Sequence, residues 1–190
     1  MKIDYLSLKK ITAMHADEIR EAVRRVVDSG WYLQGSAVSS FEAEYAQYTG
    51  TKHCIACGNG LDALRLMLRA YIELGRLKEG DEVIVPANTY IATILAITDS
   101  RLVPVPVEPD LSTLQIDSTK IESQITKRTK AIMIVHLYGR CAMTPLIAEI
   151  CKRHNLLLFE DNAQAHGCKY RAPLPPGGGS SQFAIPPTGG

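Results

Sequence analysis

The sequence lacks the features that mark nucleic-acid-binding, membrane-spanning and exported proteins. Its 21 basic and 20 acidic residues nearly cancel, and the basic ones are scattered. No apolar run approaches the roughly 20 residues that a membrane helix needs, and the run at 156–159 is typical of the longest ones. Asp4, Lys9 and Lys10 interrupt the N-terminus before a secretory signal develops. We therefore expect a cytoplasmic protein that binds neither nucleic acid nor a membrane.

Cysteine is sparse and shows no framework of pairs. The chain has five cysteines, and an odd number without an export signal favours free thiols. Cys54 and Cys57 have the C-x-x-C spacing of a zinc or redox site, but a second such pair and paired histidines are missing. Because Cys54 also falls in a strand-like run, the pattern favours buried thiols over zinc or redox chemistry, and we predict no metal site.

The remaining composition is that of an ordinary globular domain. Hydrophobic residues make up 46% and charged residues 22% of the 190-residue chain, which is long enough for one substantial core. Near the N-terminus, residues 15–29 carry apolar side chains at helical spacing, and Gly30 ends that predicted helix. A second helix is predicted from the capping box of Ser39 and Glu42 and ends at Gly50.

From residue 52 onward, strand-like and helix-like segments alternate. The apolar runs that we predict to be strands lie at 52–57, 82–86, 102–107, 131–135 and 156–160. The predicted helices lie at 59–74, 90–99, 118–125 and 144–154. Strands that are apolar throughout and alternate with helices indicate an α/β fold of three layers, with a mostly parallel sheet and helices on both faces.

The C-terminal segment 172–190 has a different character. It contains five of the ten prolines and five of the fourteen glycines, and it carries no charge. Such a segment has too little apolar surface to offset the entropy lost on ordering it. We therefore predict a disordered tail that does not belong to the fold.

Polar or glycine-rich residues follow the predicted strands, at 57–61, 86–90, 136–139 and 160–167. Ligands gather at the carboxyl ends of strands in open α/β sheets. The first turn has the free backbone N–H groups of a phosphate site, although a plain tight turn explains it as well. Asp161 is suited to hold a protonated ring nitrogen or, alternatively, to cap a helix or pair with an arginine. Tyr90 offers either a stacking face or ordinary packing.

Together these turns resemble consecutive signatures of the DegT/StrS-type sugar aminotransferases, which are fold-type-I pyridoxal phosphate enzymes. The matching segments are Gly-Asn-Gly-Leu-Asp-Ala-Leu at 58–64, Gly-Asp-Glu-Val-Ile-Val-Pro-Ala-Asn-Thr-Tyr-Ile-Ala-Thr at 80–93, Thr-Lys-Ala-Ile-Met-Ile-Val-His-Leu-Tyr-Gly at 129–139 and Glu-Asp-Asn-Ala-Gln-Ala-His-Gly at 160–167. The resemblance runs from about residue 3 to 171, and it implies that residues 1–171 are part of the large domain of such a transferase.

The resemblance also implies a set of cofactor-binding residues. Gly60 and Leu61 would bind the phosphate of pyridoxal 5′-phosphate through their backbone, and Tyr90 would stack on its ring. Asp161 would hold the pyridine nitrogen, and Gln164 would contact the phenolic oxygen side of the ring. Many relatives have threonine at the position of Leu61, so one hydroxyl contact to phosphate is lost here. The Gly-Leu-Asp-Ala-Leu sequence at 60–64 and Ser-Gly-Trp-Tyr at 29–32 resemble the subgroup that aminates C3 of dTDP-3-keto-6-deoxyhexoses. The resemblance implies glutamate as the amino donor and a homodimer as the complete form.

The sequence departs from the family after Arg171. Complete members carry a Schiff-base lysine downstream, whereas this chain has no lysine after Lys169. We therefore assign no catalytic residue and expect a truncated form that is inactive alone. Two alternatives stay open: a relative of the pyridoxamine phosphate-dependent sugar dehydratases, in which histidine replaces the lysine, and a non-catalytic remnant that binds a full-length relative.

Overall fold

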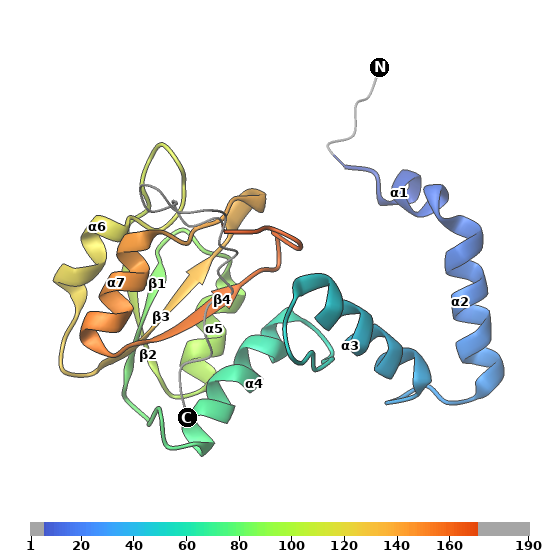
Figure 1. Cartoon of the computed structure of the whole chain (residues 1–190), viewed down its shortest axis with the longest axis horizontal. Helices are drawn as coiled ribbons and strands as arrows, with labels where there is room; N and C mark the ends of the chain where they lie inside the picture. The colour runs from blue at the N-terminus through green and yellow to red at the C-terminus, as the bar shows by residue number, and fades with distance from the viewer. Residues whose placement is uncertain (1–5, 171–190) are drawn as a thin grey trace, which may run out of the picture. The chain divides into compact units, whose positions relative to one another are not determined.

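The computed structural model describes residues 6–170 (Figure 1). The predicted tail at 172–190 lies outside these described residues. The described residues divide into two compact units, residues 6–56 and residues 57–170.

The first unit consists of helices. These are α1 (Leu8–Met14), α2 (Ala16–Ser29) and α3 (Ser36–Thr49). The predicted helix at 15–29 is confirmed, and it ends at Gly30, whose φ of 65° is the left-handed conformation that glycine adopts at low cost. α1 was not predicted. None of the three helices buries a residue.

The capping box and the strand predicted near α3 are both wrong. α3 begins three residues before Ser39, which therefore lies inside the helix with Glu42. The Glu42 carboxylate instead accepts the N–H of Ala56 at 2.8 Å. Residues 52–57 form no strand, because no segment between residues 6 and 170 pairs with them. An apolar run becomes a strand only beside a hydrogen-bonded neighbour.

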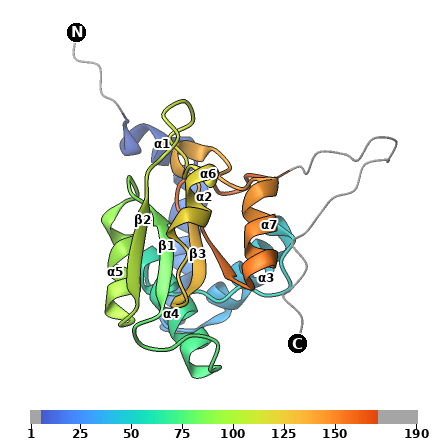
Figure 2. The same cartoon turned by 90° about the vertical axis from the view of Figure 1, so that its left-hand side faces the viewer.

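The second unit is built on a parallel sheet. Its strands are β1 (Glu82–Pro86), β2 (Val103–Val107), β3 (Thr129–Val135) and β4 (Leu157–Asp161), and their order is β2-β1-β3-β4. All of the pairs are parallel, and Figure 2 shows β2, β1 and β3 side by side. Pro104 and Pro106 lack the N–H that a central strand would need on both sides, which agrees with the edge position of β2. The four strands predicted after residue 80 are confirmed within two residues at each end.

Helices cover both faces of this sheet (Figure 1). The helices of the second unit are α4 (Gly60–Glu73), α5 (Ile91–Asp99), α6 (Ser118–Ile121) and α7 (Pro145–His154), with 3-10 turns η1 (Glu122–Gln124) and η2 (Leu137–Gly139).

Alternate strand residues enter two separate cores. Val83 and Met133 pack with α4 and α5, whereas Ile84 and Ile134 pack with the α6 and α7 side. A strand that is buried on both faces has no polar side to expose, which is why its sequence is apolar throughout. The predicted three-layer α/β fold is confirmed.

All five cysteines are free. The predicted burial of the C-x-x-C thiols is wrong for Cys57, which is exposed, whereas Cys54 is half-buried. Within residues 6–170, no cluster of three or more side chains is arranged to bind a metal ion. Over the same range, none of the helices has the length and apolarity to cross a membrane.

Candidate cofactor site

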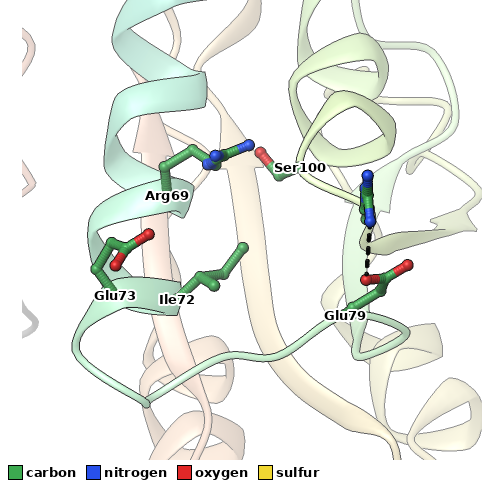
Figure 3. A pocket seen from close by; sticks show the side chains of 6 residues that line it. Arg69, Ile72, Glu73, Glu79 and Ser100 are labelled. Carbon is green, nitrogen blue, oxygen red and sulfur yellow. Dashed lines mark hydrogen bonds and ion pairs between the residues drawn. The ribbon is translucent and has the colours of Figure 1, made fainter.

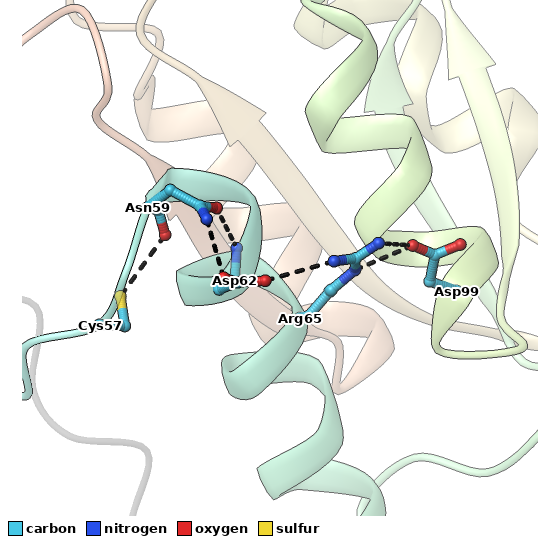
Figure 4. Close-up of polar contacts among 5 residues, drawn as sticks. All are labelled: Cys57, Asn59, Asp62, Arg65 and Asp99. Carbon is cyan, nitrogen blue, oxygen red and sulfur yellow. Dashed lines mark hydrogen bonds and ion pairs between the residues drawn. The ribbon is translucent and has the colours of Figure 1, made fainter.

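The turn before α4 is held by the side chain of Asn59. Its Oδ1 accepts the N–H of Asp62 at 2.9 Å, and its Nδ2 donates to Asp62 Oδ2 at 2.8 Å (Figure 4). Asparagine at this N-cap position satisfies one of the N–H groups that every helix start leaves without a partner. The turn therefore has a fixed geometry before any ligand arrives.

Two N–H groups at the same helix start remain available. Among the described residues, the backbone N–H groups of Gly60 and Leu61 have no acceptor. No atom lies within 4 Å of the place where a Cβ on Gly60 would stand, so the space beside it is open. The Leu61 side chain packs against the core and leaves its N–H at the helix end. Free N–H groups at the positive end of a helix dipole are suited to an anion.

An arginine balances the acid next to this helix start. Arg65 donates to Asp62 Oδ1 at 3.2 Å and, through Nε, to Asp99 Oδ2 at 2.8 Å on α5 (Figure 4). The hydrogen bonds with Asp99 raise the pKa of the Arg65 guanidinium above its usual value. Arg65 thus joins α4 to α5 and offsets the charge of Asp62, which would otherwise repel an anion at the helix start.

Tyr90 stands at the start of α5. It is the N-cap residue of that helix, and its side chain makes no capping hydrogen bond. About 70% of the residue is exposed, so a ring face is accessible for stacking. Its carbonyl accepts the N–H of Thr93 at 3.1 Å, which ties Tyr90 to the first turn of the helix.

Asp161 is the last residue of β4, and its carboxylate is held on both oxygens. Oδ1 accepts the N–H of Ala163 at 3.1 Å, and Oδ2 accepts the hydroxyl of Thr93 at 2.9 Å. The structure therefore brings Asp161 against the first turn of α5, the helix whose N-cap residue is Tyr90. The sequence analysis missed Thr93. Its position three residues after Tyr90, on the same side of a helix, is the signal that would have indicated it.

Gln164 lies in the turn after β4. Its Oε1 accepts the N–H of Tyr138 at 2.7 Å, which fixes which end of the amide faces η2. Within residues 6–170, its Nε2 has no acceptor and remains free to donate to a ligand. Tyr138 has a φ of 59° and is followed by Gly139 with a φ of 76°, so the chain turns sharply where it meets Gln164.

A buried histidine, which the sequence analysis placed in the turn at 136–139 without a role, joins the ends of β3 and β4. His136 Nδ1 accepts the N–H of Ala142 at 2.9 Å. Nε2 therefore carries the ring proton, and it donates to Glu160 Oε2 at 2.8 Å. Glu160 and Asp161 are neighbours in a strand, so their side chains point to opposite faces. The pair of His136 and Glu160 thus fixes the strand end from the face opposite to the Asp161 contact with Thr93.

The hollow drawn in Figure 3 is a different place. Its lining residues are Arg69, Ile72, Glu73, Glu79, Ser100 and Arg101. Glu79 precedes β1, and Ser100 and Arg101 precede β2, so the hollow lies toward the amino ends of the strands. It contains none of the predicted site residues. Two acids line it, Glu73 at the end of α4 and Glu79 before β1, and the C-terminal end of α4 disfavours an anion.

Donors and acceptors of several kinds lie at the carboxyl edge of the sheet and at the start of α4. The start of α4 offers two N–H donors for the anion, and Asp161 offers a carboxylate held in place. The edge also has an exposed aromatic ring at Tyr90 and a free amide donor at Gln164. These donor and acceptor types match the phosphate, ring nitrogen, ring face and phenolic oxygen of pyridoxal phosphate.

Comparison with known proteins identifies a family and several relatives that this chain resembles. The model of the DegT/DnrJ/EryC1/StrS aminotransferase family matches residues 13–180. The chain is 52% identical over 168 residues to the dTDP-3-amino-3,6-dideoxy-alpha-D-galactopyranose transaminase of Aneurinibacillus thermoaerophilus, covering 88% of this chain and 45% of that protein.

Solved structures agree with this match. The structure of DesV from S. venezuelae in complex with a ketimine intermediate is 44% identical with a TM-score of 0.84, covering 90% of this chain and 45% of that one. The E. coli GDP-4-keto-6-deoxy-D-mannose-3-dehydratase with bound hydrated PLP is 32% identical with a TM-score of 0.71, covering 75% of this chain and 37% of that one. The chain thus spans less than half the length of these relatives.

Proposed function

Because the chain belongs to the DegT/DnrJ/EryC1/StrS aminotransferase family, we propose that it forms the cofactor-binding part of a pyridoxal phosphate-dependent aminotransferase of sugar nucleotides. The observation that carries this proposal is the contact between Asp161 and Thr93, which sets the acid beside the helix that begins at Tyr90. A carboxylate and an accessible aromatic ring at one strand edge are what a pyridine ring requires on its nitrogen and on its face.

Each site residue then has a defined task. The N–H groups of Gly60 and Leu61 bind the phosphate, and the face of Tyr90 stacks on the ring. The Asp161 carboxylate accepts a hydrogen bond from the protonated ring nitrogen and keeps that proton in place. Nε2 of Gln164 donates to the phenolic oxygen. When bound, the cofactor supplies the electron sink that lets an amino group move between donor and acceptor.

The proposed substrates are a nucleotide-linked keto sugar and glutamate. Support for the sugar comes from the relative at 52% identity, which is a dTDP-amino-sugar transaminase. The carbon that is aminated, the use of glutamate and a homodimeric complete form remain predictions from the resemblance, as does the cytoplasmic location. The dehydratase alternative has weaker support, because the dehydratase structure is 32% identical to the chain whereas DesV is 44% identical.

We further propose that the 190-residue chain alone does not transaminate. The family's chemistry needs a positioned amine to move the α-proton of the amino donor, a contribution of roughly 10²–10⁴-fold. The 190-residue chain has no lysine after Lys169, and Lys169 is exposed in the segment that follows the Gln164 turn. No described contact orients its amine toward Asp161 or Tyr90.

Equilibrium dialysis with pyridoxal phosphate tests the cofactor site. We expect the 190-residue chain to bind the cofactor and Asp161→Asn to weaken binding about tenfold, the effect of losing one charge-assisted hydrogen bond. Asp17→Asn, on the exposed face of α2, is the matched control and should bind as the unmodified chain does. Failure of the unmodified chain to bind would refute the proposed cofactor site.

Borohydride reduction followed by peptide mapping tests the inactivity of the isolated chain. We expect weak labelling spread over several lysines and no glutamate-dependent amination of a nucleotide-linked keto sugar. Stoichiometric labelling of a single lysine, accompanied by turnover, would show this second proposal wrong while leaving the cofactor site intact.

A further inference from the structure

We infer that Thr93 is a positioning residue that sets the Asp161 carboxylate for the ring nitrogen of the cofactor. This inference rests on the proposed function, because it concerns the same site. Thr93 lies in the first turn of α5 and is fully buried. Its Oγ1 lies 2.9 Å from Asp161 Oδ2 and 2.9 Å from the Oγ1 of Thr89.

The chemistry of the three groups fixes the direction of this hydrogen-bond chain. A carboxylate only accepts hydrogen bonds, so the Thr93 hydroxyl must donate its single proton to Asp161. The hydroxyl of Thr93 can then only accept from Thr89, which leaves Thr89 as the donor at the start of the chain. The carboxylate thus receives a donor that is itself polarised by a second hydroxyl.

The same contact determines where the acid stands relative to the stacking ring. Asp161 ends β4, whereas Thr93 and Tyr90 belong to the start of α5, so the hydrogen bond crosses from strand to helix. The backbone N–H of Ala163 holds the other carboxylate oxygen, and a substitution of Thr93 leaves that hydrogen bond in place. Removal of the Thr93 hydroxyl would therefore leave the carboxylate held at one oxygen only and free to rotate away from the ring nitrogen.

Threonine and valine have nearly the same shape, which makes the hydroxyl separable from packing. Thr93→Val keeps the β-branched shape in the buried site and removes the hydroxyl, which donates to Asp161 and accepts from Thr89. Thr93→Ser keeps the donor and removes a methyl group. Thr98→Val, on an exposed turn of the same helix, is the matched control, since the Thr98 hydroxyl donates only to the carbonyl of Leu95.

The test compares two probes: pyridoxal 5′-phosphate and its 1-deaza analogue, in which carbon replaces the ring nitrogen. Both are titrated into the 190-residue chain by equilibrium dialysis. We expect Thr93→Val to raise the Kd of pyridoxal phosphate roughly tenfold, as expected for a hydrogen bond to a charged group. The Kd of the deaza analogue should change less than about twofold, because that analogue has no ring nitrogen for Asp161 to hold. Thr93→Ser should bind both probes as the unmodified chain does, and Thr98→Val should change neither Kd.

Other results would overturn the inference in distinct ways. Equal weakening of both probes by Thr93→Val would mean that Thr93 only supports the fold, and unchanged binding of both would mean that it does not position Asp161. If the unmodified chain binds neither probe, the proposed cofactor site itself fails. Should Thr93→Val not fold, Thr89→Val at a half-buried position applies the same test. It should weaken pyridoxal phosphate binding about two- to threefold and spare the deaza analogue, and equal effects on both probes would refute the inference.

Discussion

The apolar side chains of α2 and those of β1 follow equally regular patterns but have opposite surroundings. Val23 and Val27 on α2 are more than half exposed, whereas Val83, Ile84 and Val85 on β1 are fully buried. The difference does not come from residue type, because both segments are rich in valine and isoleucine. It comes from what lies next to them: β1 has a strand on each side and helices above and below.

This contrast shows that a periodic pattern determines local structure but not burial. A helix forms when its own residues satisfy its backbone, so α2 and α3 exist without a core. The candidate site depends on burial, since Thr93 and His136 hold their partners only inside the packed second unit. The candidate site residues therefore all lie within residues 57–170, and variants in the two units should behave differently.

The largest difference is expected for truncation of isoleucine. Ile134 in β3 is fully buried, whereas Ile19 in α2 is 42% exposed. Ile134→Ala should lower the free energy of unfolding by about 2–5 kcal/mol, because it removes apolar contacts and leaves a cavity. Ile19→Ala should stay within about 0.5 kcal/mol. Urea unfolding measures both, and similar losses would mean that the first unit is buried as deeply as the second.

A smaller difference is expected at Glu82, where the second unit buries a charge. Its carboxylate accepts from Thr126 at 2.6 Å, from Thr129 at 3.1 Å and from Arg128 at 2.5 Å. The hydrogen bond from Thr126 is the main cause that holds the pKa of Glu82 below its usual 4.5, with burial opposing it. Glu82→Gln should cost about 1–3 kcal/mol near neutral pH, since the donors lose a charged acceptor.

The pH dependence of this effect has a definite sign. Because the folded pKa of Glu82 is lowered, its stabilisation is complete above about pH 4.5 and is lost as the pH falls through the folded value. The gap in urea midpoint between the unmodified chain and Glu82→Gln should therefore be constant near neutral pH and close in acid. Glu44→Gln, at an exposed position on α3, serves as control and should show no such gap. A difference in urea midpoint that widens in acid would contradict a lowered pKa of Glu82 in the folded protein.

The sequence predicted the second unit well because its signals are local. Apolar runs between turns gave four strands, and the parallel arrangement followed from the alternation with helices. The same logic failed at 52–57, where an equally strand-like run has no neighbour within the described residues. A strand depends on hydrogen bonds to another segment, and a single run cannot show whether that segment is present.

The candidate site was predictable in part for the same reason. Glycines before a helix and an acid after a strand are local signals, so Gly60 and Asp161 could be named from the sequence. Thr93 and His136 act through partners 68 and 24 residues away, and no spacing rule connects them. Residues that would touch the ligand can thus be predicted from the turn sequences. Residues that position them can be identified only once the fold is known.

The central claim is that the cofactor binds at the carboxyl edge of the sheet in the second unit, and an NMR titration tests it most directly. Amide ¹H–¹⁵N spectra of the 190-residue chain would be recorded as pyridoxal phosphate is added. We predict shifts concentrated at Gly60, Leu61, Tyr90, Asp161 and Gln164, with the amides of α1, α2 and α3 unchanged. Shifts centred on Arg69 and Ser100, which line the hollow at the opposite edge, or spread along α2, would contradict the account.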